Sequence, residues 1–295
     1  MTRRFAWAKG HGTENDFVLL PDPDGTVHGS LDEDLVAALC HRRRGLGADG
    51  VIRVVQSAAL DEPAAAQAVA DGAEWFMDYR NADGSLSQMC GNGVRVLARF
   101  LADEGIVDPA APLAIGSRGG TRQVTCGPQG TISVDMGVAR VRGTTWVEVD
   151  ERRHQATHVD TGNPHAAAEV DDLAALAREL ARPAYDIAVY PDGVNVELWQ
   201  RVGPRWLRMR VHERGSGETR SCGTGVVAAA AAAANHEARP VTYQVDVPGG
   251  RLAVLLRDDG RATLTGTAEV VARGELRWSG SRAGPPEPDP SWRAQ

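Results

Sequence analysis

The chain has 295 residues, of which 39 are acidic and 32 are basic, and its formal net charge is −7. This acidic balance argues against a nucleic acid or an anionic membrane surface as partner, because such partners require a dense basic face. The composition is 42% hydrophobic and 24% charged, as in ordinary globular proteins, and the length suggests about two domains on the usual ~150-residue scale.

Two residue types limit the chemistry further. Lys9 is the only lysine, so no other residue could form a Schiff base to pyridoxal phosphate or serve a phosphate-binding loop. The four cysteines form no CxxC pair, so we expect no disulfide framework, no zinc site and no other bound metal. The chain also lacks an apolar run of ~20 residues and a signal-like start, so we expect a cytoplasmic protein that does not enter a membrane.

The first half of the chain alternates short apolar runs with helical segments. A capping box of Ser30 and Glu33 predicts a helix through Arg43, and a second helix is expected near 94–103. The alanine-rich segment 58–72 is expected to be a surface insertion. Short apolar or alternating runs predict strands at 17–20, 51–55, 75–79 and 132–135.

The second half follows a similar plan. A helix is expected over 171–182, stopped by Pro183, and another near 226–235 that is apolar on all sides and therefore buried. A last strand near 268–278 could return to the first half, and the proline-rich segment 280–295 is expected to be a disordered tail. Strands are predicted at 194–199, 207–211, 243–247 and 252–256.

The two halves share an internal duplication. Residues 81–90 read NADGSLSQMC and precede GNGVRVLARF, whereas residues 213–222 read ERGSGETRSC and precede GTGVVAAAAA. Repeats of this kind indicate a fold assembled from equivalent units. We therefore expect two pseudo-symmetric α/β (α+β) domains, 1–138 and 139–267, each a curved sheet around a central helix, with the active site in the cleft between them.

Cys90 and Cys222 occupy equivalent places in this duplication, each at the expected start of a helix. A single such cysteine is usually a small buried residue, but a pseudo-two-fold fold brings equivalent positions face to face. Helix starts bind anions through unpaired amides, and they also favour thiolates, whose pKa values there reach roughly 3.5–7.5. Two opposed thiols suit inversion of a carbon centre, in which one acts as base and the other as acid. The pattern therefore predicts a cofactor-independent amino-acid racemase or epimerase.

The motifs HGTENDF, GLGADG, NADGSLSQMCGNG, GNPH, NVE and ERGSGETRSCGTG occur in this order. Over roughly residues 5–276 the chain resembles the diaminopimelate epimerases, which convert LL-diaminopimelate to the meso form for lysine and peptidoglycan synthesis. The resemblance implies that Cys90 and Cys222 are the acid–base pair, supported by His165 and Glu213. It also implies substrate contacts from ten residues, namely Asn15, Asn81, Gly91, Asn92, Asn163, Asn195, Glu213, Arg214, Gly223 and Thr224.

The resemblance further implies a small-molecule substrate, no cofactor and a homodimer. An asparagine such as Asn81, within NADG, is also typical of a turn. Residues 45–50 fit GxGxxG, but they follow a helix and precede a strand, which is the reverse of the dinucleotide-binding order. Two alternatives stay open at this point. One is a proline or hydroxyproline racemase-like enzyme or isomerase of the same fold, and the other is a non-catalytic binding or redox protein that uses the two thiols.

Overall fold

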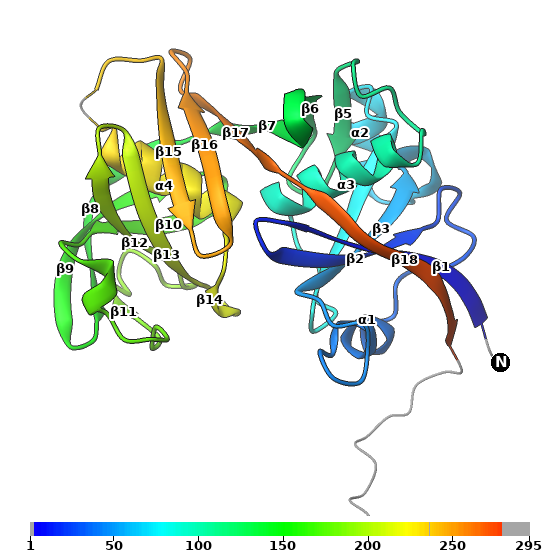
Figure 1. Ribbon diagram of the computed structural model, residues 1–295, viewed down its shortest axis with the longest axis horizontal. Helices are drawn as coiled ribbons and strands as arrows, with labels where there is room; N and C mark the ends of the chain where they lie inside the picture. The colour runs from blue at the N-terminus through cyan, green and yellow to red at the C-terminus, as the bar shows by residue number, and fades with distance from the viewer. Residues whose placement is uncertain (1–2, 236, 279–295) are drawn as a thin grey trace, which may run out of the picture.

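The computed structural model describes residues 3–235 and 237–278 (Figure 1). Its ribbon has two lobes. Helix α3 (Gly91–Asp103) packs against the strands of the first lobe, and helix α4 (Gly223–Ala233) packs against those of the second. Within the described residues, 18 strands are joined edge to edge into one hydrogen-bonded network. The predicted α+β fold, with a helix at the centre of each half, is confirmed. The predicted tail at 280–295 lies outside the described residues.

The first lobe contains three of the four α-helices of the described chain. Helix α1 (Glu33–Cys40) connects two strands that pair in parallel, β2 (Asn15–Pro21) and β3 (Gly50–Gln56), and α3 packs against the strands of this lobe. The elements are β1 (Arg3–Gly12), β2 (Asn15–Pro21), α1 (Glu33–Cys40), β3 (Gly50–Gln56), α2 (Pro63–Ala70), β4 (Trp75–Asn81), α3 (Gly91–Asp103), β5 (Leu113–Gly116), β6 (Arg122–Cys126) and β7 (Thr131–Val138).

The second lobe is built from strands around α4. Its elements are β8 (Arg140–Val149), β9 (Arg152–Asp160), β10 (Pro164–Glu169), β11 (Ala184–Tyr185), β12 (Asn195–Gly203), β13 (Trp206–Glu213), β14 (Gly217–Thr219), α4 (Gly223–Ala233), β15 (Val241–Val247), β16 (Gly250–Leu256) and β17 (Arg261–Thr267). The last strand, β18 (Glu269–Trp278), crosses back and pairs antiparallel with β1 (Figure 1). No helix of the described residues is long and apolar enough to cross a membrane.

The two central helices are buried for the reason that their sequences predict. Val226 to Ala231 on α4 are all at most 1% exposed, because this helix has no polar face to turn outward. On α3, ten of thirteen residues are buried, including the polar side chains of Asn92 and Arg95. Buried polar groups require hydrogen-bond partners. The partners of Asn92 and Arg95 include Ser221 and Thr13, which lie at the junction of the lobes.

The lobes are joined by strand pairing as well as by side chains. Strand β17 pairs antiparallel with β7, and the hydroxyls of Ser133 and Thr265 lie 2.7 Å apart across this pair. At the junction, Thr13 Oγ1 and Ser221 Oγ are 2.8 Å apart, and both residues are buried. The boundary predicted between residues 138 and 139 stays a prediction, since the sheet is continuous there.

Two helix predictions are wrong. Helix α1 spans only Glu33–Cys40, and its cap is Asp32 rather than Ser30, because Asp32 Oδ1 accepts from the backbone N–H of Asp34 at 2.8 Å. The expected helix over 171–182 contains only a 3₁₀ turn at Leu173–Ala175.

Residues 171–182 do not form the expected helix because side chains of the sheet bind the backbone of this segment. Arg210 donates to the carbonyls of Ala177 and Arg178 at 2.9 and 3.2 Å, and Glu218 accepts from the Leu180 N–H at 2.7 Å. These bonds replace those that a helix would form. The segment 58–72, expected to be a surface insertion, contains α2, which buries Ala65 and Ala68.

Candidate active site

The duplicated cysteines occupy equivalent structural positions. Cys90 caps α3 and Cys222 caps α4, so each thiol lies beside unpaired amides of a helix start. The Gly93 N–H donates to Cys90 Sγ at 3.4 Å, and Cys222 Sγ lies 3.4 Å from Thr224 Oγ1. The two helix starts approach closely, because a Cβ added to Gly223 would lie 3.3 Å from the Gly91 Cα. The first-turn amides of both helices, which can bind anions, therefore meet where Gly91 of α3 contacts Gly223 of α4, a contact here called the seam.

The thiols are not the low-pKa groups that a helix start alone predicts. Burial raises the pKa of Cys90 to about 11, and the hydrogen bond from Gly93 opposes this only in part. Burial raises the pKa of Cys222 well above its usual value, and the carboxylates of Glu213 and Glu197 raise it further. The prediction of easily ionised thiols is wrong for the protein without substrate, because desolvation outweighs the helix amides.

Cys90 is surrounded by asparagine side chains. Its thiol lies 3.6 Å from Asn15 Oδ1, which also accepts from Asn92 Nδ2 at 3.1 Å. Asn92 Nδ2 lies 3.2 Å from the carbonyl oxygen of Ser221, the residue before Cys222. The structure thus brings together Asn15, Asn92 and Cys90 from the first lobe and the start of α4 from the second.

Cys222 has acidic neighbours. Burial raises the pKa of Glu213, although hydrogen bonds from Thr219 and Cys222 lower it. The next residue, Arg214, is held by Asn195, whose Oδ1 accepts from the Arg214 backbone N–H at 2.9 Å. Asn195 in turn starts β12, which pairs in parallel register with β10 at His165. Glu213, Arg214 and Asn195 therefore lie together at one end of the second lobe.

His165 is fully buried with both ring nitrogens occupied. Nδ1 is 2.7 Å from Glu197 Oε1, and Nε2 is 3.0 Å from Asn163 Oδ1. Both ring nitrogens of His165 are thus held by side-chain oxygens, which fixes the orientation of the ring. His165 is thus joined to Asn163 and Glu197, and its predicted support of a cysteine stays a prediction.

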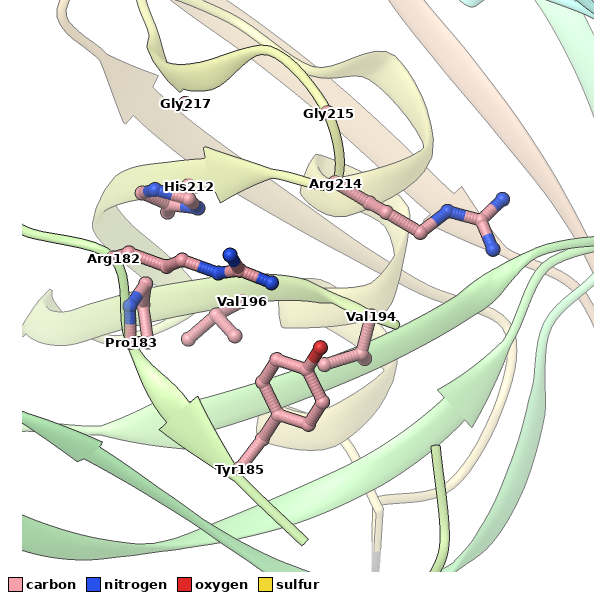
Figure 2. Close-up of a pocket in the computed structure, with 9 residues that line it drawn as sticks. All are labelled: Arg182, Pro183, Tyr185, Val194, Val196, His212, Arg214, Gly215 and Gly217. Carbon is pink, nitrogen blue, oxygen red and sulfur yellow. The ribbon is translucent and has the colours of Figure 1, made fainter. Parts of the chain in front are cut away.

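Two cavities border this end of the second lobe. One of about 440 Å³ is lined by residues that include Asn163, Asp192 and Arg214. The other, of about 330 Å³, is bordered by residues that include Arg182, His212 and Arg214 (Figure 2). In Figure 2 the Arg214 guanidinium points away from His212, and its Nη1 donates to the Asp192 carbonyl at 3.2 Å. Arg214 therefore presents its charge beside the larger cavity.

Asn81 is engaged in a turn. Its side-chain amide donates to Ser85 Oγ at 3.0 Å, and its carbonyl accepts from the Gly84 N–H. This is the alternative that NADG favours on its own, so the substrate contact of Asn81 stays a prediction.

Sequence reasoning missed three buried or partly buried partners of the site. Glu197 belongs to the NVE motif, Arg95 follows the GNG after Cys90, and Asp49 lies within the glycine-rich segment that does not fit nucleotide binding. A buried Arg or Glu on an apolar element is a signal that could have indicated the first two, since such groups are almost always paired. Asp49 carries no such signal.

Solved structures show the fold. A hydroxyproline epimerase from Agrobacterium vitis superposes with a TM-score of 0.66 at 15% identity, with 93% of each chain covered. A phenazine biosynthesis protein of the PhzF family from Bacillus anthracis gives 0.65 at 15% identity, covering 93% of this chain and 99% of the other. At such identities the similarity is one of architecture.

Sequence relatives identify the family. The family model described as diaminopimelate epimerase matches residues 7–142 and 157–271. The diaminopimelate epimerase of Thermobifida fusca is 51% identical over 279 residues, with 94% of this chain and 99% of the relative covered. That of Streptomyces coelicolor is 51% identical over 285 residues, covering 94% and 96%. With its family model, its relatives and its two helix-capping cysteines in agreement, the chain belongs to the diaminopimelate epimerase family.

Proposed function

We propose that this protein is an isomerase that interconverts LL- and meso-diaminopimelate, with Cys90 and Cys222 as the acid–base pair. The observation that carries the proposal is that the two cysteines cap two helices whose first turns meet at one seam. A substrate α-carbon bound at this seam has one thiol available to each of its faces.

The reaction needs one thiolate and one thiol. The thiolate removes the α-proton and becomes a thiol, while the opposite thiol delivers its own proton to the other face and becomes the thiolate. Negative charge that develops on the substrate carboxylate is stabilised by amides at the starts of α3 and α4. The protein ends the turnover with its two protonation states exchanged, and the reverse reaction restores them.

Because the pKa values of both thiols are raised, the substrate itself must help to form the thiolate. Both thiols are neutral at pH 7 in the free protein, because burial and the nearby carboxylates disfavour a thiolate. A substrate ammonium group beside Glu213 offsets that negative field, and a positive charge within ~4–6 Å lowers a thiol pKa. Glu213, whose own pKa is raised by burial, can share the Cys222 proton. Ionisation is therefore coupled to substrate binding.

The unreacted end of the substrate is assigned to the larger cavity. Arg214 can hold a carboxylate in a two-pronged contact, and Asn163 and Asn195 supply neutral donors and acceptors. Asn195 also orients the Arg214 backbone. This end of the site therefore reads the second amino-acid centre of diaminopimelate.

The test is incubation with LL-diaminopimelate in deuterated water with a thiol reductant and no added cofactor. Inversion should be accompanied by α-deuterium uptake. Cys90→Ala and Cys222→Ala should each lower the inversion rate by about 10²–10⁴-fold, since each direction needs both groups. Inversion at the parental rate in either variant would contradict the two-cysteine mechanism.

The family membership supports two further parts of the proposal, a homodimer and a cytoplasmic location. Sedimentation equilibrium of the purified chain tests the first, and a mass twice that of the monomer is expected. Cell fractionation tests the second.

A further inference from the structure

The polar side chains next to Cys90 form one directional hydrogen-bonded chain. Arg95 Nη2 donates to Asn92 Oδ1 at 2.8 Å, and Asn92 Nδ2 donates to Asn15 Oδ1 at 3.1 Å. Asn15 Nδ2 then donates to Asp49 Oδ2 at 2.8 Å. The chain runs from a buried cation on α3, through two amides, to a carboxylate just before β3.

The ends of this chain fix the direction of both amides. A guanidinium only donates hydrogen bonds and an ionised carboxylate only accepts them. Asn92 must therefore turn its oxygen to Arg95, and Asn15 must turn its nitrogen to Asp49. The remaining end of Asn15, its oxygen, faces the Cys90 thiol at 3.6 Å.

Asp49 is itself held firmly. Its Oδ1 accepts from Arg42 at 2.6 Å, and its Oδ2 accepts from the Asp16 backbone N–H at 3.1 Å in addition to Asn15. Asp16 binds Arg42 and Lys9 in turn. Burial would raise the pKa of Asp16, but these two cations outweigh it and lower that pKa to about 2. Burial and the Asp16 carboxylate raise the pKa of Asp49 itself, and the hydrogen bond from Asn15 and the charge of Arg42 oppose this rise. Asp49 is thus held by Arg42, by Asn15 and by the backbone of Asp16.

We propose that Asp49 is a positioning residue that keeps the oxygen of the Asn15 amide directed at the Cys90 thiol. Its importance for catalysis rests on the proposed function, whereas the orientation itself does not. An oxygen at this position accepts from S–H and therefore favours the protonated thiol, whereas the amide nitrogen would donate to sulfur and favour the thiolate. Asp49 thereby keeps Cys90 in the form of a proton donor.

The experiment measures alkylation of Cys90 by iodoacetamide at pH 8, in a Cys222→Ala background and without substrate. Peptide mass spectrometry separates Cys90 from the remaining thiols. Asp49→Ala removes one of the two hydrogen bonds that orient the Asn15 amide, and it leaves the donation from Asn92 Nδ2 to Asn15 Oδ1 as the other. A fall of about one in the Cys90 pKa raises the thiolate fraction tenfold and lowers thiolate reactivity about threefold, so the rate should rise about threefold.

Asp49→Asn separates the hydrogen bond from the charge. It removes the same charge but keeps an oxygen for Asn15, and the exposed Arg42 can retain its bonds to Asp16 alone. We expect the parental alkylation rate in this variant. Equal increases in the Ala and Asn variants would mean that the charge of Asp49 acts on the thiol through space, and would overturn the proposal.

Two further arms complete the test. In an Asn15→Leu background, Asp49→Ala should have no additional effect, because the amide through which it acts is absent. Asp135→Ala, which removes another ion-paired carboxylate of the first lobe, should leave the rate unchanged. An effect that persists without Asn15, or that Asp135→Ala reproduces, overturns the proposal, as does an unchanged rate in Asp49→Ala. If Asp49→Ala does not fold, Asp49→Ser, whose hydroxyl is too short to reach Asn15, replaces it. Since no arm uses substrate, the result is independent of whether the proposed activity holds.

Discussion

At the scale of single residues, the two cysteines show how burial and helix position compete. Both thiols cap helices, which favours the thiolate, yet Cys222 is buried near two carboxylates and Cys90 is partly buried. Enclosure prevails because a thiolate in a low-dielectric site loses its hydration. In the proposed reaction, formation of a thiolate therefore depends on the positive charge that the substrate ammonium group brings to the site.

The first prediction concerns ionisation of Cys90 in the free protein. With a pKa of about 11, only roughly one Cys90 in ten thousand is a thiolate at pH 7. Its alkylation rate should rise about tenfold per pH unit between pH 7 and 9, without a plateau. A plateau below pH 9, measured by peptide mass spectrometry, would mean that the helix amides outweigh burial after all.

The second prediction concerns Arg214. Arg214→Lys keeps the charge but loses the planar fork that binds a carboxylate through two donors. We expect KM for diaminopimelate to rise by at least about tenfold, as measured by steady-state kinetics, since charge-assisted bonds contribute about 1.5–3 kcal/mol. Arg182→Lys, in the neighbouring cavity, is the matched control and should leave KM unchanged. An equal rise in both variants would indicate a general field effect.

The third prediction concerns His28, which is 6% exposed and has no hydrogen-bond partner for either ring nitrogen within the described residues. Burial lowers its pKa, and Arg3 and Arg53 add to this against the pull of Asp22. The unfolded chain therefore binds a proton near pH 6.5 that the folded chain resists, and stability is lost as pH falls below that value.

His28→Leu should accordingly reduce the loss of thermal stability between pH 7 and pH 5. It should not abolish that loss, because burial also lowers the pKa of His158 and His212. His11→Gln serves as the control. Thermal unfolding at each pH checks the expectation, and identical pH profiles for His28→Leu and the parent would refute it.

At the scale of elements, the sequence predicts some parts well for clear reasons. Helices α3 and α4 are predicted because a duplicated cysteine and glycine motif precedes each apolar run. The segment 171–182 has a helical apolar pattern, but Arg210 and Glu218, which lie far along the chain, take its backbone groups. Strands β8 and β9 escape prediction because polar residues dominate their exposed parts.

The candidate site likewise has parts that the sequence predicts and parts that it does not. The pairing of Cys90 with Cys222 follows from the duplication. By contrast, the partner of His165 is Glu197, 32 residues away, and the partner of Asn15 is Asp49, 34 residues away. These contacts depend on strand register, which local sequence patterns do not contain.

The fourth prediction concerns the contact between the two helix starts. Gly223→Ala places a methyl group 3.3 Å from the Gly91 Cα and 3.2 Å from Leu264. Because the first neighbour is backbone, the helices must move apart, at a cost of about 1–3 kcal/mol. We expect a lower melting temperature and a lower kcat. Gly203→Ala, whose added methyl would lie 3.5 Å from Trp206, is the control and should alter neither.

At the scale of the whole molecule, the junction between the lobes combines rigid and polar contacts. The β7–β17 pair provides continuous backbone hydrogen bonds, whereas Thr13 and Ser221 contact through side chains. The seam that holds the cysteines therefore lies beside a permanent link rather than at the end of a free hinge.

The return of β18 to the first lobe also orders events during synthesis. Residues 3–7 of β1 pair with β18 and not with β2, and Phe5 packs in a cluster that Leu276 and Trp278 border. On a ribosome, the N-terminal lobe is thus made first but finished last, after the whole second lobe has emerged. Until then β1 has an open edge, the kind of edge that invites pairing with another chain. A nascent chain stalled before residue 269 should consequently be the form that chaperones retain.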